Sequence, residues 1–264
     1  MRTQLADFIR DTPAGREADA ILRNCVHCGF CTATCPTYQL LGDELDGPRG
    51  RIYLIKQVLE GKPATAKTQL HLDRCLTCRS CETTCPSGVQ YGRLLDIGRD
   101  AVQAQVGRGL LAGLMRNLLR AVIPHRARFA ALLRLGQSLR WLLAPALKNK
   151  IPARAQQTAW LANNHPRRML VLEGCAQPAL SPNTNAAAAR VLDRLGITLL
   201  PAPAAGCCGA VSQHLDAPDE ALDYMRRNID AWWPYIENGA EAIVMTASGC
   251  ATMVADYGLL LAHD

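Results

Sequence analysis

The sequence predicts an α + α/β protein with an α-helical N-terminal domain at residues 1–100, a basic helical linker at 101–166 and an α/β domain at 167–264. Three observations predict this division. The first part contains a cysteine-rich repeat joined by helical patterns. The stretch 101–172 carries twelve Lys or Arg and no Asp or Glu, and the last part alternates short apolar runs with helical patterns. With 264 residues, 49% of them hydrophobic, the chain is long enough to bury a core.

The first part contains two copies of one cysteine motif. They read CVHCGFCTATCP at 25–36 and CLTCRSCETTCP at 75–86, with identical cysteine spacing and the same final proline. Between them, residues 51–60 have apolar residues at helical spacing and are followed by Gly61 and Pro63, which end helices. We therefore expect short helices, not a sheet, to join the two motifs.

The spacing of these motifs is that of bacterial ferredoxins, in which three close thiolates bind one [4Fe–4S] cluster and the fourth cysteine binds the other cluster. On this pattern, one cluster is held by Cys25, Cys28, Cys31 and Cys85, and the second is held by Cys75, Cys78, Cys81 and Cys35. Crossed ligation keeps the two clusters close enough for electrons to pass between them. The motifs therefore predict an α-helical ferredoxin domain with two [4Fe–4S] clusters and a role in electron transfer.

Two other interpretations of these cysteines stay open. Zinc also binds four thiolates, although structural zinc sites usually use two separated C-x2-C knuckles. His27 is an alternative ligand of the Rieske type, although a loop histidine beside a complete set of cysteines more often faces solvent or donates a hydrogen bond.

The last part of the sequence predicts a parallel α/β layer with right-handed crossovers. Strands are expected at 169–172, 197–200 and 242–245, and helices at 183–195, 220–236 and after Gly249. One cysteine or cysteine pair follows each strand, so these residues are expected at the carboxyl edge of the sheet, where ligands bind. This predicts a third site for a metal, a cluster or a dithiol, with four buried structural cysteines as the alternative. Its residues are Cys175, Cys207, Cys208 and Cys250.

Taken together, these residues resemble the family of iron–sulfur subunits of bacterial glycolate oxidase (glycolate dehydrogenase). Besides the paired motifs, the resemblance rests on the stretches 47–51 (GPRGR), 174–185, 206–209 (GCCG), 228–234 and 246–250. It implies a ferredoxin domain followed by a cysteine-rich (CCG) domain. It also implies a complex with flavin-containing subunits, which carry FAD and oxidise glycolate to glyoxylate, and electron flow through the clusters toward a quinone.

The chain departs from the family pattern in two ways. Met253 stands where many CCG domains have a closing cysteine, three residues after Cys250. Members of the family also carry a second CCG copy, whereas this sequence ends at Asp264. We therefore expect a shortened chain or a fragment, with an incomplete third site.

The basic linker predicts two amphipathic helices, because Pro124 and Pro145 interrupt a Leu- and Arg-rich stretch at 110–147. Such helices can lie on an anionic membrane, or pack on the core of their own protein or on an acidic partner. Arginines that keep charge off the apolar stripe are Arg116, Arg120, Arg134 and Arg140. Nucleic acid is not expected as a partner, because aromatic residues are scarce in this stretch.

A cytoplasmic location is expected, with peripheral contact at the cytoplasmic face of the inner membrane as an option. The N-terminus has no secretory h-region, and no apolar run reaches the ~18–20 residues of a spanning helix.

Other functions remain as alternatives. They are the equivalent subunit of a lactate or glycerol-3-phosphate dehydrogenase, a thiol/disulfide enzyme of the heterodisulfide reductase type, and a scaffold that its clusters only stabilise. No group of acid–base residues suited to substrate oxidation is evident, so we expect no catalytic residue on this chain and substrate oxidation on partner subunits.

Overall fold

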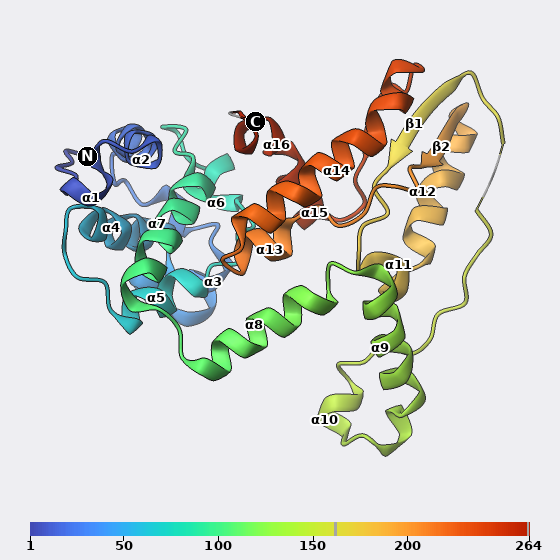
Figure 1. Ribbon diagram of the computed structural model, residues 1–264, viewed down its shortest axis with the longest axis horizontal. Coiled ribbons are helices and arrows are strands. Elements are labelled where there is room, and N and C mark those ends of the chain that lie inside the picture. Colours follow the sequence, from blue (N-terminus) through green and yellow to red (C-terminus); the bar gives the residue numbers. More distant parts are fainter. Residues whose placement is uncertain (161–162, 263) are drawn as a thin grey trace. The chain divides into compact units, whose positions relative to one another are not determined.

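The computed structural model describes residues 1–160, 163–262 and 264 (Figure 1). The chain forms two compact units, Met1–Leu110 and Leu111–Asp264. The first consists of helices, and the second combines helices with a small parallel sheet. The predicted α + α/β class is therefore confirmed, while the division into three domains at 100 and 166 stays a prediction.

Short helices and turns build the N-terminal unit, and prolines begin three of them. Pro13, Pro36 and Pro48 each stand at the first position of a helix, where the missing N–H costs no hydrogen bond. The predicted helix at 51–60 is α4, which begins earlier than expected for this reason. The elements are α1 (Asp7–Arg10), α2 (Pro13–Asn24), η1 (Phe30–Thr32), α3 (Pro36–Leu41), η2 (Glu44–Asp46), α4 (Pro48–Leu59), α5 (Ala66–Asp73), α6 (Ser80–Thr83) and α7 (Tyr91–Val106).

The core of this unit lies between α2, α4 and α7. Leu22, Ile55 and Leu94 are fully buried in it. Helices α4 and α7 approach closely at Gly98, where an added Cβ would lie 2.5 Å from the Cγ1 atom of Ile55. Cysteines of both motifs are buried in this core or pack against it, so the hydrophobic core also supports the motif loops.

Asp96 on α7 provides a test of how this unit responds to pH. Burial raises its pKa to about 6, above the ~3.9 of an exposed Asp. Because the fold disfavours the charged carboxylate, stability falls as pH rises from about 4 to about 6. We expect Asp96→Asn to raise the free energy of unfolding by about 1–3 kcal/mol at pH 7.5 and by less at pH 5. Urea unfolding at both pH values measures this, with exposed Asp11→Asn as the control; equal gains at both pH values would contradict it.

The C-terminal unit contains a three-stranded parallel sheet in the order β2-β1-β3. Figure 1 shows β1 and β2 beside each other. Met169 pairs with Leu199, and Leu170 pairs with Ile243. The observed strands are β1 (Arg167–Val171), β2 (Ile197–Pro201) and β3 (Ile243–Val244). They lie where the apolar runs predict them, and the parallel arrangement is also as predicted.

Helices flank this sheet and follow the predicted order. Buried Leu170, Met225 and Trp232 form the core between the sheet and α14. The observed helices are α11 (Gln177–Leu180), α12 (Asn183–Arg194), α13 (Ala210–His214), α14 (Pro218–Glu237), α15 (Ser248–Ala255) and α16 (Tyr257–Leu260).

The basic segment forms α8 (Leu110–Val122) and α9 (Arg126–Ser138), followed by η3 (Arg140–Leu142) and α10 (Pro145–Lys148). Acidic residues of the C-terminal unit neutralise part of its charge. Arg116 lies 2.6 Å from Asp216, and Arg120 lies 2.6 Å from Glu220. Within the described part of the chain, no helix has the length and apolar character needed to cross a bilayer.

Candidate metal centres

The two cysteine motifs adopt the same unusual loop conformation. The second and fourth residues after the first cysteine have positive φ in each copy: His27 (60°) and Gly29 (87°), then Thr77 (52°) and Arg79 (57°). A non-glycine residue in this region costs about 1–2 kcal/mol. The loops therefore hold backbone strain at matching positions, as functional loops often do.

The first cavity gathers cysteines from both motifs. It is lined by Cys25, Cys28, Cys31 and Cys85, and encloses about 430 Å³ of space, part of it open to solvent. Its other lining residues include Ile52, Val89 and Cys81. Burial raises the pKa of the Cys31 thiol to about 11, and the neighbouring Cys25 sulfur adds to this.

The second cavity gathers the other four cysteines of the motifs. It encloses about 290 Å³ and is lined by Cys35, Cys75, Cys78 and Cys81. Burial strongly raises the pKa of the Cys81 thiol. Pro48, Cys81 and Tyr91 line both cavities, so the two sites share a wall.

These donor sets fit a metal cluster. Each cavity brings together at least four thiols, with Cys81 common to both, and thiolates are the ligands of iron–sulfur clusters. Buried thiols with raised pKa values stay protonated at neutral pH unless a cation stabilises the thiolate. Bound iron would supply that positive charge.

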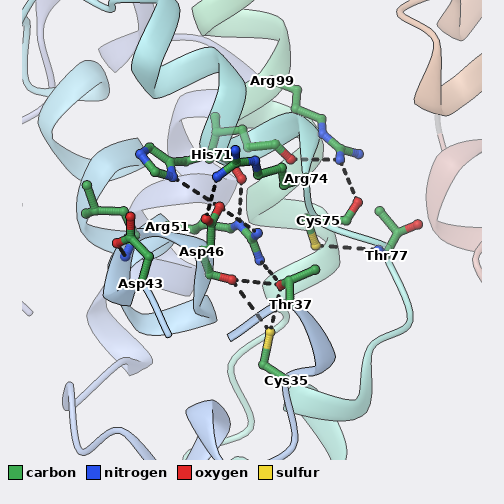
Figure 2. A network of polar contacts seen from close by, with 12 residues as sticks. Cys35, Thr37, Asp43, Asp46, Arg51, His71, Arg74, Cys75, Thr77 and Arg99 are labelled. Atoms are coloured by element: carbon green, nitrogen blue, oxygen red, sulfur yellow. Dashed lines mark hydrogen bonds and ion pairs between the residues drawn. The ribbon is translucent and has the colours of Figure 1, made fainter. Parts of the chain in front are cut away.

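Polar groups approach the sulfurs of the second cavity (Figure 2). The Thr37 hydroxyl lies 3.2 Å from the Cys35 Sγ atom, and the Thr77 backbone N–H donates to the Cys75 Sγ atom at 3.4 Å. The Tyr91 hydroxyl donates to the same Cys75 sulfur at 3.6 Å. Such hydrogen bonds to cysteine sulfurs stabilise negative charge on them.

A buried network of charges lies behind Cys35, as Figure 2 shows. Asp46 and Arg51 are both fully buried. The Asp46 carboxylate lies 3.5 Å from the Arg51 Nη2 atom, 2.8 Å from the Arg74 Nη1 atom and 3.0 Å from the His71 Nδ1 atom. Although burial opposes it, the hydrogen bonds from His71 and Arg74 hold the pKa of Asp46 below its usual value.

The four cysteines of the third predicted site lie together at the carboxyl edge of the sheet. The Cys207 thiol contacts those of Cys175 and Cys208, and the Cys208 sulfur also contacts Cys250. Hydrogen bonds from the Cys207 thiol lower the pKa values of Cys175 and Cys208, and a hydrogen bond from Cys250 also lowers that of Cys208. The contact with Cys175, and then that with Cys208, raises the pKa of Cys207, and the contact with Cys208 raises that of Cys250. The arrangement favours thiolates held by neighbouring thiols, which suits a metal or dithiol chemistry.

Two buried residues position the Cys207–Cys208 backbone. The Asn228 side chain accepts from the Gly206 N–H and donates to the Cys207 carbonyl oxygen, both at 2.8 Å. The Tyr257 hydroxyl donates to the Cys208 carbonyl oxygen at 2.8 Å. Met253 is buried in the core of this unit, so the structure assigns it a packing role.

Comparison with known proteins agrees with this geometry. Residues 21–89 match the 4Fe-4S dicluster domain, and residues 169–255 match the cysteine-rich domain. Over its full length, the chain is 62% identical to the glycolate oxidase iron-sulfur subunit of Escherichia coli (strain K12), of which it covers 65%. The chain is a relative of glycolate oxidase iron–sulfur subunits. The predicted resemblance is therefore confirmed.

A second relative is more distant. The chain is 29% identical, over 92% of its length, to a "Probable glycolate oxidase iron-sulfur subunit" of Bacillus subtilis (strain 168), of which it covers 60%. The chain thus spans less than two thirds of the length of either relative. No solved structure gives a significant match.

Iron–sulfur binding is the part of the cofactor prediction that these matches confirm, and it disfavours zinc in the motif loops. Sequence reasoning missed Asp46, His71 and Thr37 as parts of the site. The stretch GPRGR at 47–51 was the one available signal, because it supplies Arg51 and directly follows η2, which carries Asp46. Asp43, Asp46 and His71 also place ligand-type atoms within 4.8 Å of one another, but two arginines already neutralise Asp46.

Gly50 is the second glycine of the GPRGR stretch, and the close packing of α4 against η2 requires a glycine there. An added Cβ would lie 2.1 Å from the backbone oxygen of Glu44, so η2 and Asp46 would have to move away from α4. We expect Gly50→Ala to cost about 1–3 kcal/mol of stability, as overpacking usually does, and to lower iron content. Thermal unfolding and iron analysis of Gly50→Ala test this. Gly109→Ala is the control because nothing lies within 4 Å of its Cβ; equal effects of the two variants would refute the explanation.

Proposed function

We propose that this chain is the electron-transfer subunit of a glycolate-oxidising complex and that each motif cavity holds one [4Fe–4S] cluster. The observation that carries the proposal is the wall shared by the two cavities, formed by Pro48, Cys81 and Tyr91. Clusters on either side of one side-chain layer are close enough to exchange electrons. Two thiolate sites built only for stability would not need to be adjacent.

The ligand assignment follows the cavities. One cluster is assigned to Cys25, Cys28, Cys31 and Cys85, and the other to Cys75, Cys78, Cys81 and Cys35. In this assignment, the last cysteine of each motif serves the cluster of the other motif. The crossed ligands tie the two loops together, so loss of one cluster also loosens the other.

The clusters would supply one-electron steps to a two-electron reaction. Oxidation of glycolate to glyoxylate releases two electrons and two protons. Flavin-containing partner subunits carrying FAD accept the pair and pass electrons singly through the clusters toward a quinone. The names of the two relatives support glycolate as the substrate.

Co-purification followed by enzyme assay tests this function. The chain is expressed with its neighbouring flavin-containing subunits, and dye reduction is measured with glycolate, lactate and glycerol-3-phosphate. Glycolate is expected to support the fastest reduction and to reduce the clusters, as seen by EPR. If lactate or glycerol-3-phosphate reacted faster, that compound would replace glycolate as the proposed substrate of the complex. Clusters that no substrate reduces would instead favour a scaffold.

We further propose that Cys175, Cys207, Cys208 and Cys250 form a third metal or thiol site. Their mutual contacts support it, and the position of Met253 leaves it without the usual closing cysteine. Iron and sulfide analysis of a Cys207→Ser/Cys208→Ser variant tests a cluster there. Iron unchanged from about eight per chain would eliminate a third cluster, and disulfide reductase activity of the isolated chain would then favour thiol chemistry.

Contact with the cytoplasmic face of the inner membrane stays a prediction. Helix α8 exposes Leu111, Leu114 and Leu118, which favours contact with an apolar surface. Its arginines at 116 and 120 are instead paired with acidic residues of the same unit, which favours packing on the protein itself. Flotation of the intact complex with anionic liposomes tests the contact, and no retention would rule it out.

A further inference from the structure

The surroundings of the two cavities differ in charge. Arg51 lines the second cavity and is fully buried. Its Nε atom donates to the His71 carbonyl oxygen at 2.7 Å, and its Nη1 atom donates to the Thr37 hydroxyl oxygen at 3.1 Å. The first cavity is instead lined by Arg49, whose side chain is 35% exposed and lies 2.6 Å from Glu44.

The buried ion pair of Arg51 and Asp46 turns its positive end toward the second cavity, because Arg51 lines that cavity and Asp46 does not. The other two charges of the group, Arg74 and Asp43, are exposed to solvent and opposite in sign. Arg51 is therefore the buried positive charge that faces the cluster site. A buried charge is screened little by salt or water, so its field extends into the second cavity.

Arg51 also orients the hydroxyl that approaches Cys35. Because Thr37 accepts a hydrogen bond from Arg51, its own proton points elsewhere, toward the Cys35 sulfur at 3.2 Å or the Asp46 carbonyl oxygen at 2.8 Å. When Cys35 is a thiolate, its sulfur becomes the stronger acceptor. Thr37 then donates a hydrogen bond to a cluster ligand.

Both features favour the reduced form of one cluster. A [4Fe–4S] cluster becomes more negative on reduction, so nearby positive charge and hydrogen bonds to its sulfurs raise its reduction potential. We propose that Arg51, acting directly and through Thr37, sets the potential of the second-cavity cluster above that of the first. Electrons arriving at the pair then rest on the cluster bound by Cys35, Cys75, Cys78 and Cys81. This inference rests on the proposed function, because it assumes one cluster in each cavity.

Potentiometric EPR of the full chain with reconstituted clusters tests the proposal. Cys28→Ser and Cys78→Ser first assign each signal to a cavity. Arg51→Gln is expected to lower the equilibrium constant for reduction of the second-cavity cluster at least tenfold, or about 59 mV, and to change that of the other less than twofold. Thr37→Val, which keeps the shape of the side chain, is expected to lower the equilibrium constant for reduction of the second-cavity cluster about threefold. Arg49→Gln is the matched control and should leave the second-cavity potential unchanged.

The outcomes separate this inference from the proposed function. Wild-type chain with fewer than two cluster signals would overturn the function. Two signals of which the higher-potential one belongs to the first cavity would overturn the inference alone. The inference would also be overturned if Arg49→Gln changed the second-cavity cluster as much as Arg51→Gln does. The same holds if Thr37→Val left the equilibrium constant for reduction of that cluster within twofold of the wild-type value. If Arg51→Gln fails to fold, Thr37→Val and the signal order decide.

Discussion

Cys35→Ala should remove the same cluster as Cys78→Ala, although the two cysteines belong to different motifs. Both line the second cavity with Cys75 and Cys81. We expect each variant to lose about four of about eight irons, to keep the EPR signal of the first cavity, and to abolish glycolate-dependent dye reduction by the complex. Cys31→Ala and Cys85→Ala should remove the other cluster.

Iron analysis and EPR of the four variants measure this pattern. Thr83→Ala is the control, because this exposed residue lies two positions from Cys81 and from Cys85, and its hydroxyl donates to the Ser80 carbonyl oxygen at 3.0 Å. It should keep both signals. If Cys35→Ala and Cys31→Ala leave the same residual signal, the ligands are not crossed and each motif serves its own cluster.

Asp46→Asn should cost the N-terminal unit more stability than Gly50→Ala. It removes the negative charge opposite Arg51, and both side chains are fully buried. Breaking a buried pair from one side costs about 3–5 kcal/mol, because the remaining charge is left uncompensated. Urea unfolding of the cluster-loaded chain measures the loss. Added salt should restore little of it, because buried charges are weakly screened.

The matched control is Asp7→Asn. Asp7 also pairs with an arginine, Arg10, but their side chains are 92% and 59% exposed. Exposed pairs contribute about 0–1 kcal/mol, so we expect little change. If the two variants lose equal stability, the buried network contributes no more to the free energy of unfolding than an exposed ion pair does.

Local sequence signals are enough to predict the strands and the longer helices of the C-terminal unit. The strands follow from short apolar runs, because β1 and β2 bury apolar residues of those runs. The apolar spacing at 51–60 predicts a helix that starts too late, because the proline at position 48 begins it. The gathering of Cys175, Cys207, Cys208 and Cys250 follows from topology, since the carboxyl ends of parallel strands meet at one edge of a sheet.

Local sequence patterns do not predict the charge network beside Cys35. Asp46, Arg51, His71 and Arg74 come from η2, α4, the end of α5 and the residue after it. No periodicity or spacing links them, and each alone reads as an ordinary polar residue. Only the packing of α4 against η2 at Gly50 brings Asp46 under Arg51.

The sequence by itself determined the chemistry of this protein: eight cysteines in two matched loops, because ligand type and spacing are local properties of the chain. It also determined the α/β character of the second unit, because apolar periodicity is local as well. The tertiary structure decided which cavity receives a buried arginine. That is a question of distance between remote segments, and it is answered only when hydrophobic burial brings the segments together.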